Sequence, residues 1–163
     1  MTNTALVAII MGSDSDLPVM KGAAEALEKF GVGFEMRVLS AHRTPIEAAQ
    51  FAQEARGRGI RVIIAGAGAA AHLAGAVAAQ SVLPVSGVPI STPPLHGMDS
   101  LRATVQMPKG IPVATVAISN AFNAGLLAVQ ILGAGVAGTS DAMLDKMAAY
   151  KQELRSAALA KKI

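Results

Sequence analysis

Five uninterrupted apolar runs of strand length recur along the chain, and stretches with helical patterning separate them. The runs lie at residues 5–11, 33–39, 60–65, 83–88 and 113–118, and the helical stretches at 17–30, 45–58, 70–81, 100–106 and 120–132. Uninterrupted apolar runs are typical of strands buried on both faces of a parallel sheet. The regular alternation of strand and helix therefore predicts an α/β fold, an open and doubly wound parallel sheet with right-handed crossovers.

The length and composition are those of one domain with a large core. The chain has 163 residues, of which 52% are hydrophobic and 15% charged, and no linker or fixed-period repeat interrupts it. We expect a single domain over residues 1–163, because one domain usually takes about 100 to 200 residues. Five strands are the number in a flavodoxin-like sheet, whose order is 2-1-3-4-5.

The composition also argues against several classes of protein. Aromatic residues make up 3% with no Trp, so the stacking surfaces of single-strand nucleic-acid binders are nearly absent. The net charge of +3 is spread along the chain and forms no basic patch. No apolar run approaches the roughly 18 residues of a membrane span, and the N-terminus lacks the basic region of a signal peptide. With no Cys, a cytoplasmic location is expected.

The last helical stretch, within residues 139–163, carries apolar residues at alternating spacings of four and three. They are Met143, Met147, Tyr150, Leu154 and Ala157. Such a narrow stripe either packs on its own domain or contacts another chain. Because the other helices suffice to cover five strands, we expect a C-terminal helix that mediates oligomerisation.

The turn after the first predicted strand contains the first group of candidate binding residues. Ser13 and Ser15 offer hydroxyls to a phosphate near a helix N-terminus, and Asp16 can accept hydrogen bonds from ribose hydroxyls. A plain polar turn with Asp16 as a helix N-cap is the alternative. A magnesium site at Asp14 and Asp16 is less favoured, since no third carboxylate follows nearby.

The turn after the second predicted strand brings together Ser40, His42 and Arg43. Residues 44–47 (TPIE) match a capping box with Pro at the first helical position, so a helix should begin at Pro45. Arg43 supplies a forked donor for phosphate, and the His42 imidazole suits proton transfer near neutral pH. A surface turn without function is the alternative.

The third group follows the third strand, where residues 66–71 match the dinucleotide-binding pattern G-x-G-x-x-A. That pattern needs an acidic residue about 20 positions later, but residues 55–98 contain no Asp or Glu, which disfavours nicotinamide binding. Gly68 and Ala69 would instead allow close approach to a planar ligand. His72, on a different loop from His42, is either a ligand contact or a helix-start histidine.

All three turns follow predicted strands at their carboxyl ends. In a sheet of order 2-1-3-4-5, the turns after strands one, two and three border one crevice at the switch point of the strand order. The ligand that these side chains imply has a phosphate, a ribose and a small base.

Four segments carry a specific resemblance. They are residues 11–16 (MGSDSD), 40–45 (SAHRTP), 65–73 (AGAGAAAHL) and 106–113 (QMPKGIPV). Together they resemble the PurE family, the N5-carboxyaminoimidazole ribonucleotide mutases of de novo purine synthesis. The segments 91–96 and 119–122 depart from the family pattern.

The resemblance implies a rearrangement, without cofactor or metal, that moves a carboxylate from the exocyclic nitrogen to carbon C4 of the imidazole by loss and recapture of CO₂. It implies that His42 is the catalytic acid/base. The implied substrate contacts are Ser13, Ser15, Asp16, Ser40, Arg43, Gly68, Ala69 and His72.

The resemblance further implies a homo-octamer that exchanges its C-terminal helix, and transient contact with the carboxylase that makes the substrate. Two rival functions are direct carboxylation of aminoimidazole ribonucleotide by CO₂ and nucleotide sensing without turnover. Arg43 and Pro45 favour the mutase over the direct carboxylase, and His42 favours it over the sensor.

Overall fold

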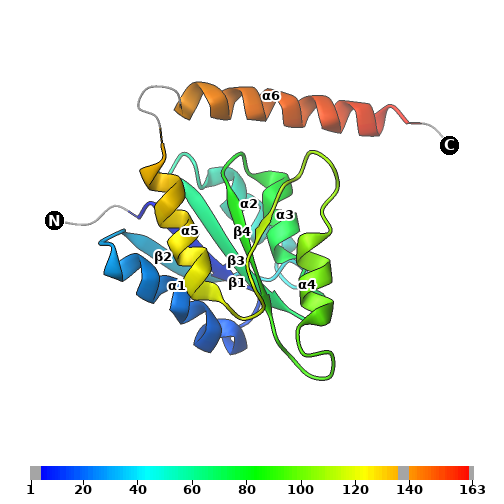
Figure 1. Ribbon diagram of the computed structural model, residues 1–163. Helices are drawn as coiled ribbons and strands as arrows, with labels where there is room; N and C mark the ends of the chain where they lie inside the picture. Colours follow the sequence, from blue (N-terminus) through cyan, green and yellow to red (C-terminus); the bar gives the residue numbers. More distant parts are fainter. Residues whose placement is uncertain (1–4, 136–139, 162–163) are drawn as a thin grey trace.

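The structure is a computed structural model that describes residues 5–135 and 140–161. It contains a sheet of five parallel strands in the order β2-β1-β3-β4-β5 (Figure 1). The strands are β1 (Val7–Met11), β2 (Phe34–Val38), β3 (Val62–Gly68), β4 (Val85–Ile90) and β5 (Ala114–Thr115). The predicted doubly wound, flavodoxin-like sheet is confirmed, including its strand order.

Helices cover both faces of the sheet (Figure 1). They are α1 (Leu17–Lys29), α2 (Pro45–Glu54), α3 (Leu73–Gln80), α4 (Met98–Val105), α5 (Ala121–Gly133) and α6 (Ser140–Leu159). The pair α1 and α5 packs on one face, whereas α2 and α3 pack on the other. Each strand between two such layers must be apolar on both sides, which is why the apolar runs are uninterrupted.

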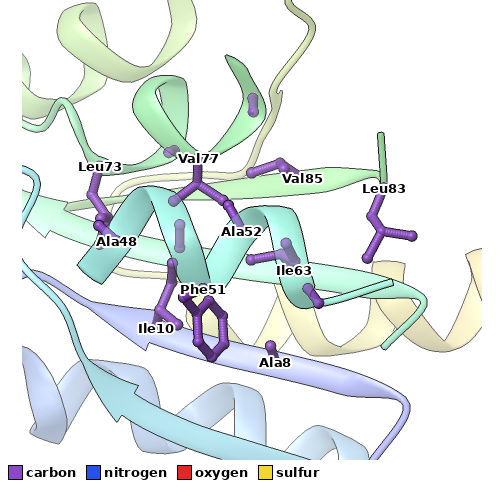
Figure 2. Close-up of a cluster of buried hydrophobic side chains, with 14 of the residues drawn as sticks. Ala8, Ile10, Ala48, Phe51, Ala52, Ile63, Leu73, Val77, Leu83 and Val85 are labelled. Carbon is purple, nitrogen blue, oxygen red and sulfur yellow. The ribbon is translucent and has the colours of Figure 1, made fainter. Parts of the chain in front are cut away.

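The alternation of side chains along β1 divides the core into two clusters. Val7, Ile9 and Met11 face α1 and α5. Ala8 and Ile10 face the opposite side, where they join a cluster with α2 and α3 (Figure 2). Figure 2 labels its members Ala8, Ile10, Ala48, Phe51, Ala52, Ile63, Leu73, Val77, Leu83 and Val85. Burial of these side chains on both faces holds the carboxyl edge of the sheet in place for the loops that follow it.

Two predicted helices were too long, because the apolar pattern extends into residues whose backbone forms a turn. Helix α2 ends at Glu54 and not at residue 58, since the chain turns through Gly57 to Gly59, where φ is +93°. Helix α3 begins at Leu73 and not at residue 70, because Ala69 has a left-handed φ of +49°.

The fifth predicted strand is also shorter than expected. Only Ala114 and Thr115 pair regularly with β4, although residues 113–118 were predicted. Beyond them the chain follows β4 irregularly: Val116 N–H donates to Gly87 O, and Ser119, with a φ of +56°, donates its N–H to Pro89 O. An edge strand has one partner only, so its apolar pattern does not force regular pairing.

Helix α6 forms as predicted and contacts the ends of α2 and α3 that point away from the carboxyl edge of the sheet. Asp145 pairs with Arg56 at 2.8 Å, and Lys151 Nζ donates to the carbonyl oxygens of Ala78 and Ser81. Burial lowers the pKa of Lys151.

The apolar stripe predicted on α6 is described in part. Leu154 is half-buried, whereas Tyr150 and Ala157 are exposed; the side chains of Met143 and Met147 lie outside the described residues. The role of this stripe in subunit contact stays a prediction. Of the described helices, none has the length and apolar character needed to span a membrane.

Candidate active site

One cavity of ≈410 Å³ opens at the carboxyl edge of the sheet. It is lined by Gly12, Ser13, Ser15, Asp16, Ser40, Ala41, His42, Arg43, Ala67, Gly68, Ala69, Ala70, His72, Leu73 and Thr92. All nine residues predicted as catalytic or substrate-binding are among them. The loops that follow β1, β2 and β3 therefore meet at one place, as the parallel-sheet rule predicts.

The first loop folds as a short 3-10 helix, Asp14–Asp16, with a reciprocal cap. Ser13 N–H donates to Asp16 Oδ2 at 3.0 Å, and Ser13 Oγ accepts from Ser15 N–H at 3.3 Å. Asp16 occupies the N-cap position of α1, as the alternative interpretation expected, but its side chain makes no capping hydrogen bond to that helix. Its carboxylate instead organises the turn and lines the cavity.

The carboxylate of Asp16 is buried, with 7% of the residue exposed. Burial raises the pKa of Asp16 above its ordinary value, while the N–H groups of Ser13 and Gly12 and the charge of Arg43 oppose that rise. Loss of hydration disfavours the ionised form, and hydrogen bonds and a nearby cation favour it. Hydroxyl donors from a ligand would further satisfy this oxygen pair.

The second loop begins helix α2 at Pro45, as predicted, but the predicted capping box is wrong. Thr44 makes no side-chain cap to α2. Its Oγ1 donates to Ser40 O at 3.1 Å and accepts from Ser40 N–H at 2.9 Å. These two bonds close the turn of residues 40–44. They use the hydrogen and one acceptor site of the Thr44 hydroxyl, which therefore bonds within the turn and not to α2. This closure presents His42 and Arg43 to the cavity.

Arg43 connects the first two loops. Its Nη2 donates to Gly12 O at 3.0 Å, and its Nε lies 3.4 Å from Ser40 Oγ. A guanidinium has five N–H donors, so several stay available to an anion. Arg43 also lines a second cavity of ≈430 Å³ with Gly12, Ser13 and Ser40. The guanidinium of Arg43 therefore lies between two cavities, and hydroxyl and backbone groups border both.

The end of β3 and the loop after it consist of small residues. The reason is steric and does not involve dinucleotide binding. A Cβ at Gly68 would lie 2.8 Å from Thr92 Cγ2, a distance that real Cβ contacts essentially never show. Gly68 is therefore needed for the close approach of Thr92. The two small residues that follow, Ala69 and Ala70, are exposed in the cavity wall.

His42 and His72 come together although they stand on different loops. His42 Nε2 lies 2.8 Å from His72 Nδ1, and the ring planes meet at 82°. His72 occupies the N-cap position of α3 without a side-chain bond to that helix. The interpretation of His72 as a mere helix-start histidine is therefore unnecessary, since its ring contacts the proposed acid/base.

The model of one protein family, described as AIR carboxylase, matches residues 6–157. The chain belongs to this family. It is 66% identical over 128 residues to the N5-carboxyaminoimidazole ribonucleotide mutase of Pyrococcus horikoshii, covering 78% of this chain and 72% of that one. It is 57% identical over 156 residues to the mutase of the same name from Synechocystis, covering 96% and 86%. The predicted PurE resemblance is confirmed.

A solved structure agrees with the fold. The crystal structure of Treponema denticola PurE has a TM-score of 0.73 and 26% sequence identity, and the match covers 97% of this chain and 99% of that chain. The fold of this chain is thus similar to that of a solved PurE.

Six lining residues were not among the predicted site residues, and Thr92 is the one of these six with a polar side chain. It follows β4, at the same edge of the sheet as the other three loops, and this position was the signal that could have found it. Thr92 Oγ1 is buried and has no hydrogen-bond partner among the described residues. No group of three or more metal-ligating side chains occurs in the part of the chain that the structure describes.

Proposed function

We propose that this chain converts N5-carboxyaminoimidazole ribonucleotide to 4-carboxy-5-aminoimidazole ribonucleotide, with His42 as the acid/base. Relatives of the same family that are 57% and 66% identical are named for this mutase activity. The predicted enzyme class, an isomerase of purine biosynthesis, is confirmed by these relatives. The observation that carries the proposal is the presence of a guanidinium, a ring of hydroxyls and an imidazole pair in one cavity.

Arg43 and the hydroxyls of Ser13, Ser15 and Ser40 bind the phosphate of the ribonucleotide. The Arg43–Gly12 bond supports this role, because it holds the guanidinium at the loop that carries Ser13 before substrate arrives. Charge-assisted bonds from Arg to phosphate are among the strongest in proteins. Asp16, buried beside Ser13, accepts hydrogen bonds from the ribose hydroxyls.

The imidazole base of the substrate lies against Gly68 and Ala69, facing His42. Small side chains leave room for a planar ring, and apolar walls keep water from the CO₂ released within the site. A tight fit matters here, because free CO₂ that escapes ends the reaction without product.

The transfer needs one proton to move in step with the carboxylate. The bond from carbon to the exocyclic nitrogen breaks, and this nitrogen takes a proton from His42. The ring carbon C4 then forms its bond to CO₂, and the C4 proton returns to His42. No net proton is gained or lost, so one imidazole suffices as acid and then as base.

We further propose that the chain works in the cytoplasm as a homo-octamer through α6 and meets transiently the carboxylase that makes its substrate. The exposed aromatic side chain of Tyr150 on α6 supports a subunit contact. The instability expected of an N-carboxylated amine supports a direct hand-over.

The decisive test incubates the purified protein with N5-carboxyaminoimidazole ribonucleotide, without ATP, biotin or added metal, and identifies the product by NMR. We expect 4-carboxy-5-aminoimidazole ribonucleotide. Product formed only from aminoimidazole ribonucleotide and bicarbonate would indicate a direct carboxylase. Binding measured by calorimetry without conversion would indicate a sensor, and either result would overturn the mutase proposal.

A further inference from the structure

The contact between His42 and His72 constrains where their protons lie. The two nitrogens are 2.8 Å apart, which is a hydrogen-bond distance. Two bare nitrogens would oppose their lone pairs, and two N–H groups would bring their hydrogens together. One hydrogen must therefore stand between His42 Nε2 and His72 Nδ1, and one ring donates while the other accepts.

The chemistry of the proposed mutase decides which ring donates. In the acid stage His42 is an imidazolium and carries hydrogens on both nitrogens, so its Nε2–H must donate and His72 Nδ1 must accept. After His42 gives up a proton, the same arrangement persists only if that proton leaves from Nδ1. The opposite arrangement would require His72 to move its hydrogen from Nε2 to Nδ1 and back during each turnover.

We propose that His72 is a positioning residue, which accepts the Nε2–H of His42 in both stages and so makes Nδ1 of His42 the nitrogen that exchanges protons with substrate. This inference depends on the proposed function and adds to it the identity of the reactive atom. His72 itself is then neutral, with its hydrogen on Nε2. An acceptor that holds one N–H of a catalytic imidazole in this way fixes both its tautomer and its orientation.

The backbone on both sides supports this role. His72 O accepts from Ala76 N–H at 2.9 Å in the first turn of α3. On the other side, the Thr44–Ser40 bonds close the turn that carries His42. Both histidines are nevertheless exposed, so their contact contributes little to the core. A role in catalysis accounts for a contact that stability does not require.

The test compares two substitutions at His72. In His72→Asn the side-chain oxygen can reach the position of Nδ1 and accept the same bond, whereas His72→Leu has similar bulk and no acceptor. We expect His72→Leu to lower kcat by about 10- to 100-fold, a loss of the size seen when the partner that orients a metal-binding imidazole is removed. We expect KM to stay within about 3-fold and His72→Asn to keep kcat within about 3-fold of wild type.

The matched control is His96→Asn. His96 is exposed, does not line the cavity and has a φ of +49°, which Asn tolerates. This variant should keep wild-type kcat and KM. A wild-type kcat in His72→Leu, or an equal loss in His72→Asn and His72→Leu, would overturn the proposal.

A second readout needs no turnover. The chain has three histidines, so ¹⁵N-labelled histidine gives few signals and single variants assign them. At about pH 9, where ordinary imidazoles are neutral, His42 should show the Nε2–H tautomer and His72→Leu should shift it toward a mixture. A His42 signal of the Nδ1–H tautomer in wild type would overturn the proposal. If the wild type shows the Nε2–H tautomer of His42 but does not convert the substrate, the mutase function fails and the hydrogen-bond assignment stands.

Discussion

Arg43 Nη2 donates to the carbonyl oxygen of Gly12 across 3.0 Å, and this bond joins the loop after β2 to the loop after β1. The guanidinium is therefore oriented before an anion binds. A donor that is already oriented loses less conformational freedom on binding, so more of its interaction appears as affinity.

Substitution of Arg43 by Ala should weaken ribonucleotide binding. A charge-assisted bond to phosphate contributes roughly 1.5 to 3 kcal/mol, which corresponds to about a 10- to 150-fold rise in Kd. Titration calorimetry with the carboxylated product measures this change. Arg43→Lys, which keeps the charge but loses the fork, should recover only part of the affinity. An unchanged Kd in Arg43→Ala would remove this residue from the phosphate site.

Substitution of His42 by Asn should abolish turnover and leave ligand binding intact. Arg43 and the hydroxyls hold the phosphate without the imidazole, while a general acid/base group contributes about 10²- to 10⁴-fold to the rate. Turnover should be measured beside calorimetric binding and circular dichroism of the same sample. Retention of more than about a tenth of the wild-type rate would contradict the assignment of His42 and direct attention to His72.

The buried carboxyl of Asp16 predicts a pH-dependent stability. Because burial raises the pKa of Asp16 above 3.8, ionisation is less favourable in the folded chain than in the unfolded chain. The stability contributed by this group is fully present below pH 3.8 and is lost as the pH rises through the raised folded pKa. Asp16→Asn keeps an oxygen for Ser13 N–H but cannot ionise.

The unfolding free energy of wild type minus that of Asp16→Asn should therefore fall as the pH rises from the acid range to neutrality. Denaturant titrations at a series of pH values measure this difference. Ribonucleotide affinity at neutral pH should also fall in the variant, since Asn offers one acceptor oxygen in place of two. A free-energy difference that grows with pH would contradict the burial argument.

The packing of α1 against α5 predicts a sharp steric effect at Gly125. A Cβ there would lie 2.6 Å from Ala26 Cβ and 2.7 Å from Ala23 O, both in α1. Gly125→Ala should lower the free energy of unfolding by about 1 to 3 kcal/mol, the usual cost of overpacking a core. In the same helix, Gly133 has nothing within 4 Å of its added Cβ. Gly133→Ala should raise stability by about 0.5 to 1 kcal/mol, and the opposite ranking would exclude the steric explanation.

Removal of residues 140–163 should reduce the size of the assembly. Tyr150 on α6 exposes 38% of its surface, and it lies on the predicted stripe for subunit contact. Light scattering of the truncated and full chains measures the mass, and circular dichroism checks that the rest stays folded. A folded truncated chain with the full assembly mass would restrict α6 to contacts such as Lys151 with Ala78 and Ser81 in its own chain.

The sequence was sufficient to locate the site because strand order and loop position depend on coarse patterns. The uninterrupted apolar runs predicted parallel strands, and the carboxyl ends of parallel strands meet at one edge. Ser13 and Arg43 lie in the loops after two such strands and Gly68 ends the third, so their convergence needed no knowledge of side-chain geometry. The same rule applied to β4 would have added Thr92.

Finer features depend on competition between hydrogen-bond partners, which sequence patterns do not resolve. Thr44 and Glu47 match the sequence pattern of a capping box. The Thr44 hydroxyl nevertheless bonds to Ser40, because the turn of residues 40–44 forms immediately before the helix. The 2.8 Å contact between His42 and His72 depends on backbone positions 30 residues apart in the chain. Such distances arise only after the sheet and both helices have packed.

The cavity takes its wall from the ends of four strands, and this has a consequence for refolding. Ser13, Arg43, Gly68 and Thr92 are separated by long stretches of chain, so no fragment that lacks one of the four strands contains the complete cavity. Pairings between strands distant in sequence are slow to form, because the intervening chain must first be ordered. After dilution from denaturant, ligand affinity should therefore return only when the last of these strands has paired. We expect this recovery to be slower than the recovery of the helical circular dichroism signal.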